Sequence, residues 1–102
     1  MPKLYEYFGL LVLFYSNEHE PIHVHGIDPD GRELKAEIIV KDGKVKKIRY
    51  VTVGNTPPLA GKHERDFKAL VAARAEDIVS KWIAFFVLKK AVKLERITKR
   101  IK

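Results

Sequence analysis

The sequence predicts an α+β fold: a small antiparallel sheet of about five strands, followed by one long amphipathic helix that packs on one face of it. Two observations support this prediction. Strand-forming residues and period-two alternation dominate residues 3–53, whereas apolar residues recur at spacings of three and four between residues 67 and 86. The 102 residues fit a single domain covering residues 1–102.

The first two predicted strands cover residues 3–8 and 10–15, and Gly9 separates them. The second is an unbroken apolar run, which is typical of a strand in the middle of a sheet. A third strand begins at Ile22, directly after Pro21, because proline lacks the backbone donor of a central strand position.

Two further strands follow, each preceded by a turn signal. The Asp-Pro-Asp-Gly run at 28–31 predicts the first turn, and residues 34–40 then alternate as a half-buried strand. Asp42 and Gly43 predict a hairpin turn, after which residues 45–53 alternate again.

The helical stripe predicts one helix with acidic residues in its first turn, Glu64 and Asp66. Arg74 interrupts the stripe, so a bend between residues 72 and 76 is expected, although no glycine or proline requires one. Phe85 lies off the stripe and is expected to be exposed. The stripe consists of Phe67, Leu70, Val71, Ile78, Val79, Trp82, Ile83 and Phe86.

Residues 93–101 fit neither period well. They are expected to form a short edge strand, with a basic tail as the alternative. An unpaired strand at the sheet edge, or an exposed Phe85, would also suit a homodimer.

The net charge of +7 comes entirely from the second part of the chain. Eight basic residues balance eight acidic ones up to Gly61, whereas twelve face five from Lys62 onward. Such asymmetry indicates a polyanionic or acidic protein partner, with a merely solvated tail as the alternative. The candidate binding residues are Lys89, Lys90, Lys93, Arg96, Lys99 and Arg100.

The composition also bears on the cellular location of the protein and on the kinds of site that it can contain. The chain has no cysteine, so disulfides and thiolate metal sites are excluded. The apolar run at residues 10–14 lacks the flanks of an export signal and is too short to cross a membrane. We therefore expect a cytoplasmic protein with no membrane partner.

Residues 14–26 hold three of the four histidines, and they are the part of the sequence that indicates chemistry. On a strand, His23 and His25 would share the face opposite Ile22 and Val24. His19 could fold back as a third metal ligand. Oxygen donors come from Glu18, Glu20 or Asp28.

Nitrogen and carboxylate ligands without sulfur suit Zn²⁺, Mn²⁺ or Fe²⁺. An open coordination position would let such a metal activate water, as in a metal-dependent hydrolase.

Two other hypotheses fit the same stretch. Histidines titrate near neutral pH, so His19, His23 and His25, with Glu18, could perform acid–base catalysis without a metal, and a nearby basic surface would suit RNA cleavage. Alternatively, the histidines only pair with acids and carbonyls in a structural or interaction domain. The sequence does not decide whether the protein is an enzyme. His63, near the helix start, is assigned to the surface or to helix capping.

The run from Phe14 to His25, FYSNEHEPIHVH, closely resembles the signature of bacterial domain-of-unknown-function family 4160. Members are short proteins that usually carry F-Y-S-N-E-H-x-P-P-H-V-H near the start. Many also have a later helix with a tryptophan and paired aromatics, to which Trp82, Phe85 and Phe86 are similar. The chain departs from the pattern at Ile22, where a second proline is usual.

The resemblance implies no established activity. Members are commonly encoded beside a second small protein, and these pairs look like toxin–antitoxin modules. The resemblance therefore implies a protein partner, with RNA or DNA as a further one. The polar residues that it carries over are Ser16, Asn17, Glu18, His19, His23 and His25, of which Ser16 and Asn17 are binding candidates.

Overall fold

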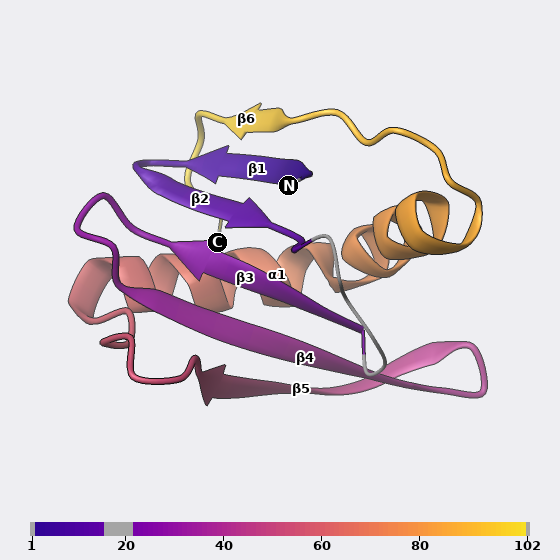
Figure 1. The fold of residues 1–102 in the computed structure, drawn as a ribbon, viewed down its shortest axis with the longest axis horizontal. Coiled ribbons are helices and arrows are strands. Elements are labelled where there is room, and N and C mark those ends of the chain that lie inside the picture. Colours follow the sequence, from indigo (N-terminus) through magenta and orange to yellow (C-terminus); the bar gives the residue numbers. More distant parts are fainter. Residues whose placement is uncertain (1, 16–21, 102) are drawn as a thin grey trace.

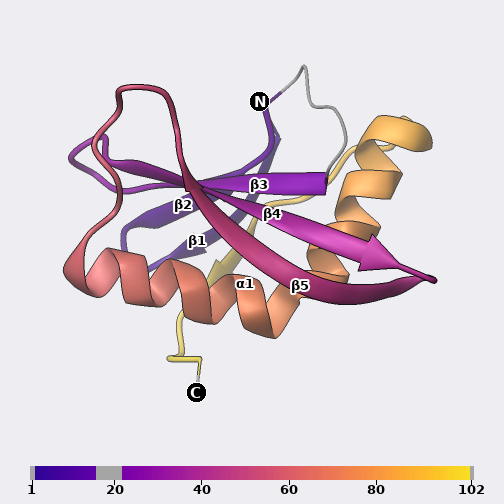
Figure 2. The ribbon, with the colours of Figure 1, turned by 90° about the horizontal axis from the view of Figure 1, so that it is seen from below.

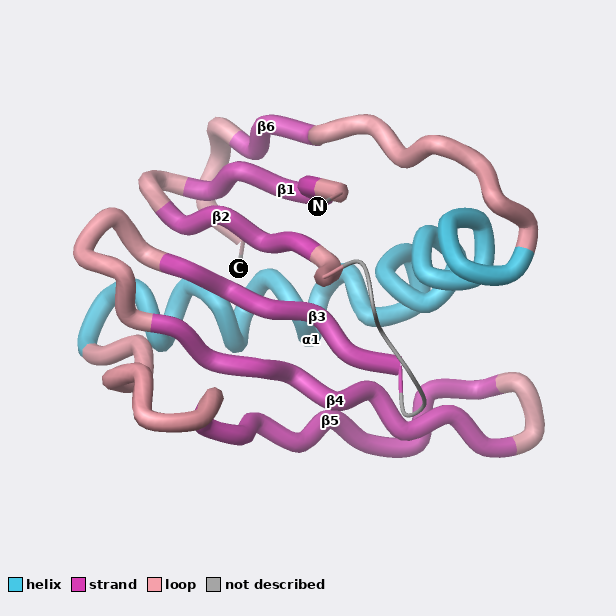
Figure 3. The backbone as a smooth tube through the Cα atoms, viewed as in Figure 1, coloured by secondary structure: helices cyan, strands magenta, loops and turns pink. Residues whose placement is uncertain are grey.

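The computed structural model describes residues 2–15 and 22–101, and it confirms the predicted α+β fold. Six strands form one sheet, and a helical layer lies behind it (Figure 1; Figure 3). The strands are β1 (Lys3–Tyr7), β2 (Leu10–Leu13), β3 (Ile22–Ile27), β4 (Glu33–Lys41), β5 (Lys44–Thr52) and β6 (Glu95–Ile97). The helices are α1 (Gly61–Trp82) and the π-helix η1 (Ile83–Val87).

The strand order across the sheet is β5-β4-β3-β2-β1-β6. The first five strands are antiparallel neighbours, as predicted. The expected C-terminal strand is confirmed for Glu95–Ile97, but it pairs with β1 in parallel, so the sheet is not antiparallel throughout. The chain reaches this edge after running the length of α1, which brings β6 back alongside β1.

Two tight turns join neighbouring strands. Asp42 and Gly43 have φ angles of 55° and 77°, and positive values at both positions are those of a type I′ hairpin turn. Phe8 and Gly9, at 48° and 87°, make the turn between β1 and β2. Phe8 therefore belongs to the turn, whereas the alternation of residues had placed it in the first strand.

Helix α1 packs closely on one face of the sheet, as Figure 2 shows from the side. At Gly26 a Cβ atom would lie 2.5 Å from the ring of fully buried Phe67, so a side chain there would push the helix away. The core between the layers includes Val24, Ala36 and Ile78, all with no exposed surface. Burial of such apolar surface holds the two layers together.

The predicted bend in the helix is confirmed at Arg74, whose φ and ψ of −115° and 16° are not helical. Beyond Trp82 the chain continues as η1. The expectation that Phe85 is exposed was wrong: it is half-buried, with its ring centroid 6.4 Å from Phe14 and 4.8 Å from Phe86. The exposed apolar residues at this end are Ile83, Val87 and Leu88.

Within the described residues, none of the helices combines the length and the apolar character needed to cross a membrane.

Candidate functional site on the open face of the sheet

Strand alternation places His23 and His25 on the sheet face away from α1, while Ile22 and Val24 enter the core, as predicted. The two imidazole rings meet edge to face, with centroids 5.3 Å apart and an angle of 72°. We call this surface the histidine face. It is built from His23, His25, Glu33, Lys35, Glu37 and Arg49 on β3, β4 and β5.

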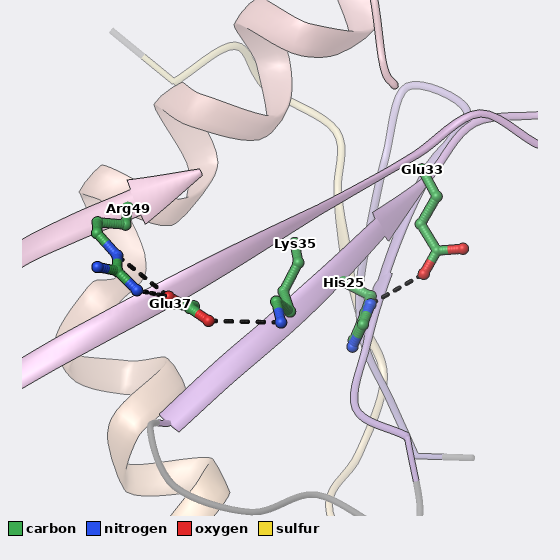
Figure 4. Close-up of polar contacts among 5 residues, drawn as sticks. All are labelled: His25, Glu33, Lys35, Glu37 and Arg49. Atoms are coloured by element: carbon green, nitrogen blue, oxygen red, sulfur yellow. Dashed lines mark hydrogen bonds and ion pairs between the residues drawn. The ribbon is translucent and has the colours of Figure 1, made fainter. Parts of the chain in front are cut away.

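His25 is the more buried of the two histidines, with 4% of its surface exposed. The ring of Tyr15 lies over it at a centroid distance of 4.1 Å. His25 Nδ1 lies 2.9 Å from Oε2 of Glu33, and the Tyr15 hydroxyl donates to the same oxygen at 2.6 Å. Figure 4 shows the imidazole and the Glu33 carboxylate turned toward each other.

Burial lowers the pKa of His25 to about 4, although the hydrogen bond to Glu33 acts in the opposite direction. The ring is therefore neutral at physiological pH. Its single N–H is on Nδ1, where it donates to the Glu33 carboxylate, so Nε2 carries the lone pair. The carboxylate thus fixes the tautomer and turns Nε2 into an acceptor, which suits a metal ligand, a general base or a ligand-binding atom.

A row of charges lies beside the histidines. His23, Glu37 and Arg49 are direct neighbours across β3, β4 and β5. Arg49 donates to Oε1 of Glu37 from Nε at 3.2 Å and from Nη2 at 2.5 Å, and Lys35 lies 3.4 Å from the other carboxylate oxygen (Figure 4). The hydrogen bonds from Arg49 lower the pKa of Glu37. Glu37 thereby holds the charged groups of Lys35 and Arg49 on the histidine face.

Two of the three histidines predicted to bind a metal, His23 and His25, lie together on this face. Among residues 2–15 and 22–101, no group of three or more His, Asp or Glu residues is arranged to hold a metal ion. The third expected ligand, His19, and the oxygen donors Glu18 and Glu20 lie outside the described residues. Metal binding by His19, His23 and His25 therefore remains a prediction.

The third expected oxygen donor, Asp28, has another role. Its Oδ1 accepts hydrogen bonds from the backbone N–H groups of Asp30 and Arg32, at 2.9 and 3.0 Å. Its Oδ2 lies 3.7 Å from Nδ1 of His63. Asp28 thus closes the turn after β3 and pairs with His63 at the start of α1.

The remaining binding candidates fall into two groups. Ser16 and Asn17 lie outside the described residues. In the C-terminal region, Lys89, Lys90, Lys93 and Lys99 are exposed. Arg96 and Arg100, by contrast, form tertiary ion pairs, Arg96 with Glu6 at 3.2 Å and Arg100 with Asp66 at 2.7 Å.

Arg100 also lies 4.3 Å above the Phe8 ring. Part of the positive charge that suggested a binding tail therefore stabilises the fold.

Sequence reasoning overlooked five residues of the site: Tyr15, Glu33, Lys35, Glu37 and Arg49. The turn signal at residues 28–31 was not sufficient, because symmetric pairing about it would put Ala36 opposite His23. A connection of residues 28–32 gives the observed pairs, Glu37 with His23 and Lys35 with His25.

The fold and the site together define a small α+β protein whose sheet is covered by helix on one face and carries a buried imidazole–carboxylate pair on the other. A family model described as a domain of unknown function (DUF4160) matches residues 9–83, which include the whole histidine face, and the chain belongs to this family. No curated protein and no solved structure matches the chain.

Proposed function

We propose that this protein is a partner-binding module that holds RNA on the histidine face and forms one half of a toxin–antitoxin-like pair with a second small protein. The observation that carries the proposal is the neutral His25 imidazole, held by Glu33 with Nε2 as an acceptor. The resemblance of residues 14–25 to the family signature supports the second protein as partner.

RNA suits this acceptor because its 2′-hydroxyl groups are hydrogen-bond donors that DNA lacks. His25 Nε2 is buried, so this contact requires the atoms that cover it to move aside. The neighbouring cations, Lys35 and Arg49, are of the kind that contact phosphate oxygens. Both are more exposed than the carboxylate that they share, so their outer N–H groups can reach a ligand.

A purely structural use of His25 explains less. Burying an imidazole costs free energy, because its polar atoms lose their contact with water. An apolar residue would fill the same space without that penalty. Buried titratable groups with a dedicated hydrogen-bond partner are characteristic of functional sites.

The test measures the affinity of a labelled single-stranded RNA for the wild type and for His25→Phe, which keeps an aromatic ring under Tyr15 but removes both nitrogens. Loss of one hydrogen bond predicts a roughly tenfold rise in Kd, from a contribution of about 1.4 kcal/mol. His63→Phe is the matched control, because His63 lies at the start of α1, and its Kd should equal that of the wild type.

A wild type that binds no RNA at low salt, or a His25→Phe variant with unchanged affinity, would refute the proposal. A parallel measurement in EDTA separates the metal hypothesis: binding that disappears with EDTA and returns with Mn²⁺ would make a metal ion the agent of recognition.

A further inference from the structure

The sheet face that carries the histidines continues along β4 and β5 to the end of their hairpin. In the β4–β5 hairpin, Glu37 is opposite Arg49, Ile39 is opposite Lys47, and Lys41 is opposite Lys44. Alternate residues of a strand share a face, and directly paired residues point the same way. Lys41, Lys44 and Lys47 therefore lie on the same face of the sheet as Glu37 and His23.

The end of this hairpin projects beyond the strand that carries the histidines. The pairing of β3 with β4 stops at Ile22 and Ile38, whereas β4 and β5 continue to the turn at Asp42 and Gly43 (Figure 1). The type I′ turn matches the twist of the two strands and closes the projecting part tightly. A register shift between Ile39 and Val40 leaves Lys46 without a partner on β4, so that Lys44 and Lys47 lie on the same face.

The three hairpin lysines are exposed, and none forms an ion pair with another residue that the structure describes. This distinguishes them from Arg96 and Arg100, whose charges are paired with Glu6 and Asp66. The balanced net charge of the first 61 residues hid this excess, because Asp42 is the only acid in the run from Lys41 to Lys47, which holds four lysines. Glu33 and Glu37 are buried further along the face.

We propose that Lys41, Lys44 and Lys47 form a phosphate-binding track that guides the backbone of a nucleic acid along β4 and β5 to His23 and His25. This inference rests on the proposed function and names the element that would supply most of its affinity. Lys41 lies six positions beyond Lys35 along β4, a span of roughly 20 Å at strand spacing, which covers several successive phosphates. Lysine contacts of this kind position the backbone without reading sequence.

The same lysines have a competing explanation. β5 is at the edge of the sheet, and lysines on an edge strand prevent it from pairing with another molecule. In that case their removal would cause self-association and leave RNA affinity unchanged.

The experiment compares two triple variants that each remove three positive charges from exposed sites. The hairpin variant carries Lys41→Gln, Lys44→Gln and Lys47→Gln. The matched control carries Lys89→Gln, Lys90→Gln and Lys93→Gln in the C-terminal region that the sequence favoured. Both are titrated with single-stranded RNA and with duplex RNA between 50 and 300 mM salt, and light scattering monitors their oligomeric state.

If the track exists, the hairpin variant should bind RNA at least tenfold more weakly than the wild type at the lowest salt. The slope of log K against log salt should become less steep by about 2, since each lost phosphate contact removes about 0.7 for a single strand. The control should stay within about threefold of the wild type, the range expected from net charge alone.

Three results would overturn the track. These are equal losses in the two variants, an unchanged Kd with new self-association of the hairpin variant, and equally tight wild-type binding of poly-glutamate. In each of these, RNA binding by the wild type and its dependence on His25 would survive. A wild type that binds no RNA would instead remove the proposed function itself, and the track with it.

Discussion

Two clusters in this protein each join a tyrosine hydroxyl to a carboxylate, but the second partner of the carboxylate differs between them. On the helix side, the Tyr5 hydroxyl donates to Asp77, a carboxylate that also accepts from Lys81 at 2.7 Å. On the histidine face, the Tyr15 hydroxyl donates to Glu33, whose second partner is the neutral imidazole of His25. Among the described residues, Glu33 pairs with no lysine or arginine.

The difference lies in what each carboxylate does. Burial alone would raise the pKa of Asp77, but hydrogen bonds from Lys81 and Tyr5 outweigh it and lower the pKa. Burial and the bond to Asp77 raise the pKa of Tyr5, so this tyrosine stays protonated and joins β1 to α1. Glu33 instead orients a ring whose other nitrogen is an acceptor. The Asp77 carboxylate and its cation join β1 to α1, whereas the Glu33 carboxylate fixes the tautomer of His25.

Removing the two carboxylates should produce the largest contrast. Glu33→Ala removes the acceptor that the half-buried Tyr15 hydroxyl and the buried His25 imidazole share, and should lower the free energy of unfolding by about 3 kcal/mol. Asp77→Ala orphans only the Tyr5 hydroxyl and frees Lys81 to reach water, so about 1.5 kcal/mol is expected. Urea unfolding at pH 7.5 measures both. Equal losses would mean that the two clusters are energetically alike.

A change in pH should affect the histidine cluster more than the helix-side cluster. The pKa of His25 falls from 6.5 to about 4 on folding, so between these values the unfolded chain binds a proton that the folded protein does not. The free energy of unfolding should therefore decrease by about 2 kcal/mol as the pH is lowered from 7.5 to 5. Within the described part of the chain, the titratable groups beside His25 are Glu33, His23, Lys35 and Tyr15.

His25→Asn isolates this contribution, because the other histidines still titrate in the variant. Its loss of stability between pH 7.5 and 5 should be smaller than that of the wild type by the same amount. Equal pH dependence in the two proteins would show that His25 is not held neutral. Glu37 does not interfere in this range, since its lowered pKa confines its titration to more acidic conditions.

The smallest expected effects come from the two tyrosine hydroxyls. Tyr5→Phe should reduce the free energy of unfolding by about 1 kcal/mol and leave RNA affinity unchanged. Tyr15→Phe should weaken RNA binding about threefold, because Glu33, which orients His25, would itself be held by one fewer hydrogen bond, while stability falls by less than about 1 kcal/mol. Parallel unfolding and RNA titrations of both variants give the comparison. The reverse pattern would assign the functional role to the helix side.

Local sequence signals were sufficient for most of the fold. Period-two alternation located β3, β4 and β5, the Asp-Gly turn located the hairpin, and the interruption at Arg74 located the bend. These features depend on neighbouring residues. The parallel pairing of β6 and the half-burial of Phe85 depend on packing between distant segments, which no local period records.

The site divides in the same way. The shared face of His23 and His25 follows from their spacing, and it was predicted. The roles of Glu33 and Tyr15 were not predicted. They depend on the strand register and on the ring of Tyr15, which follows β2 and lies over His25 of β3. Charge counting along the chain also could not show that Arg96 and Arg100 are paired, whereas Lys41, Lys44 and Lys47 form no ion pair within residues 2–15 and 22–101.

The parallel pairing of β6 with β1 also constrains the order in which this protein can fold. Tyr5 is in register with Glu95, so strands from distant parts of the sequence must meet to complete that edge of the sheet. Contacts of such long range form late, because the intervening chain must first be ordered. On a ribosome, the outer edge of β1 therefore stays open while the other strands pair. Amide hydrogen exchange during refolding should show protection appearing at β1–β6 after it has appeared at β3–β4.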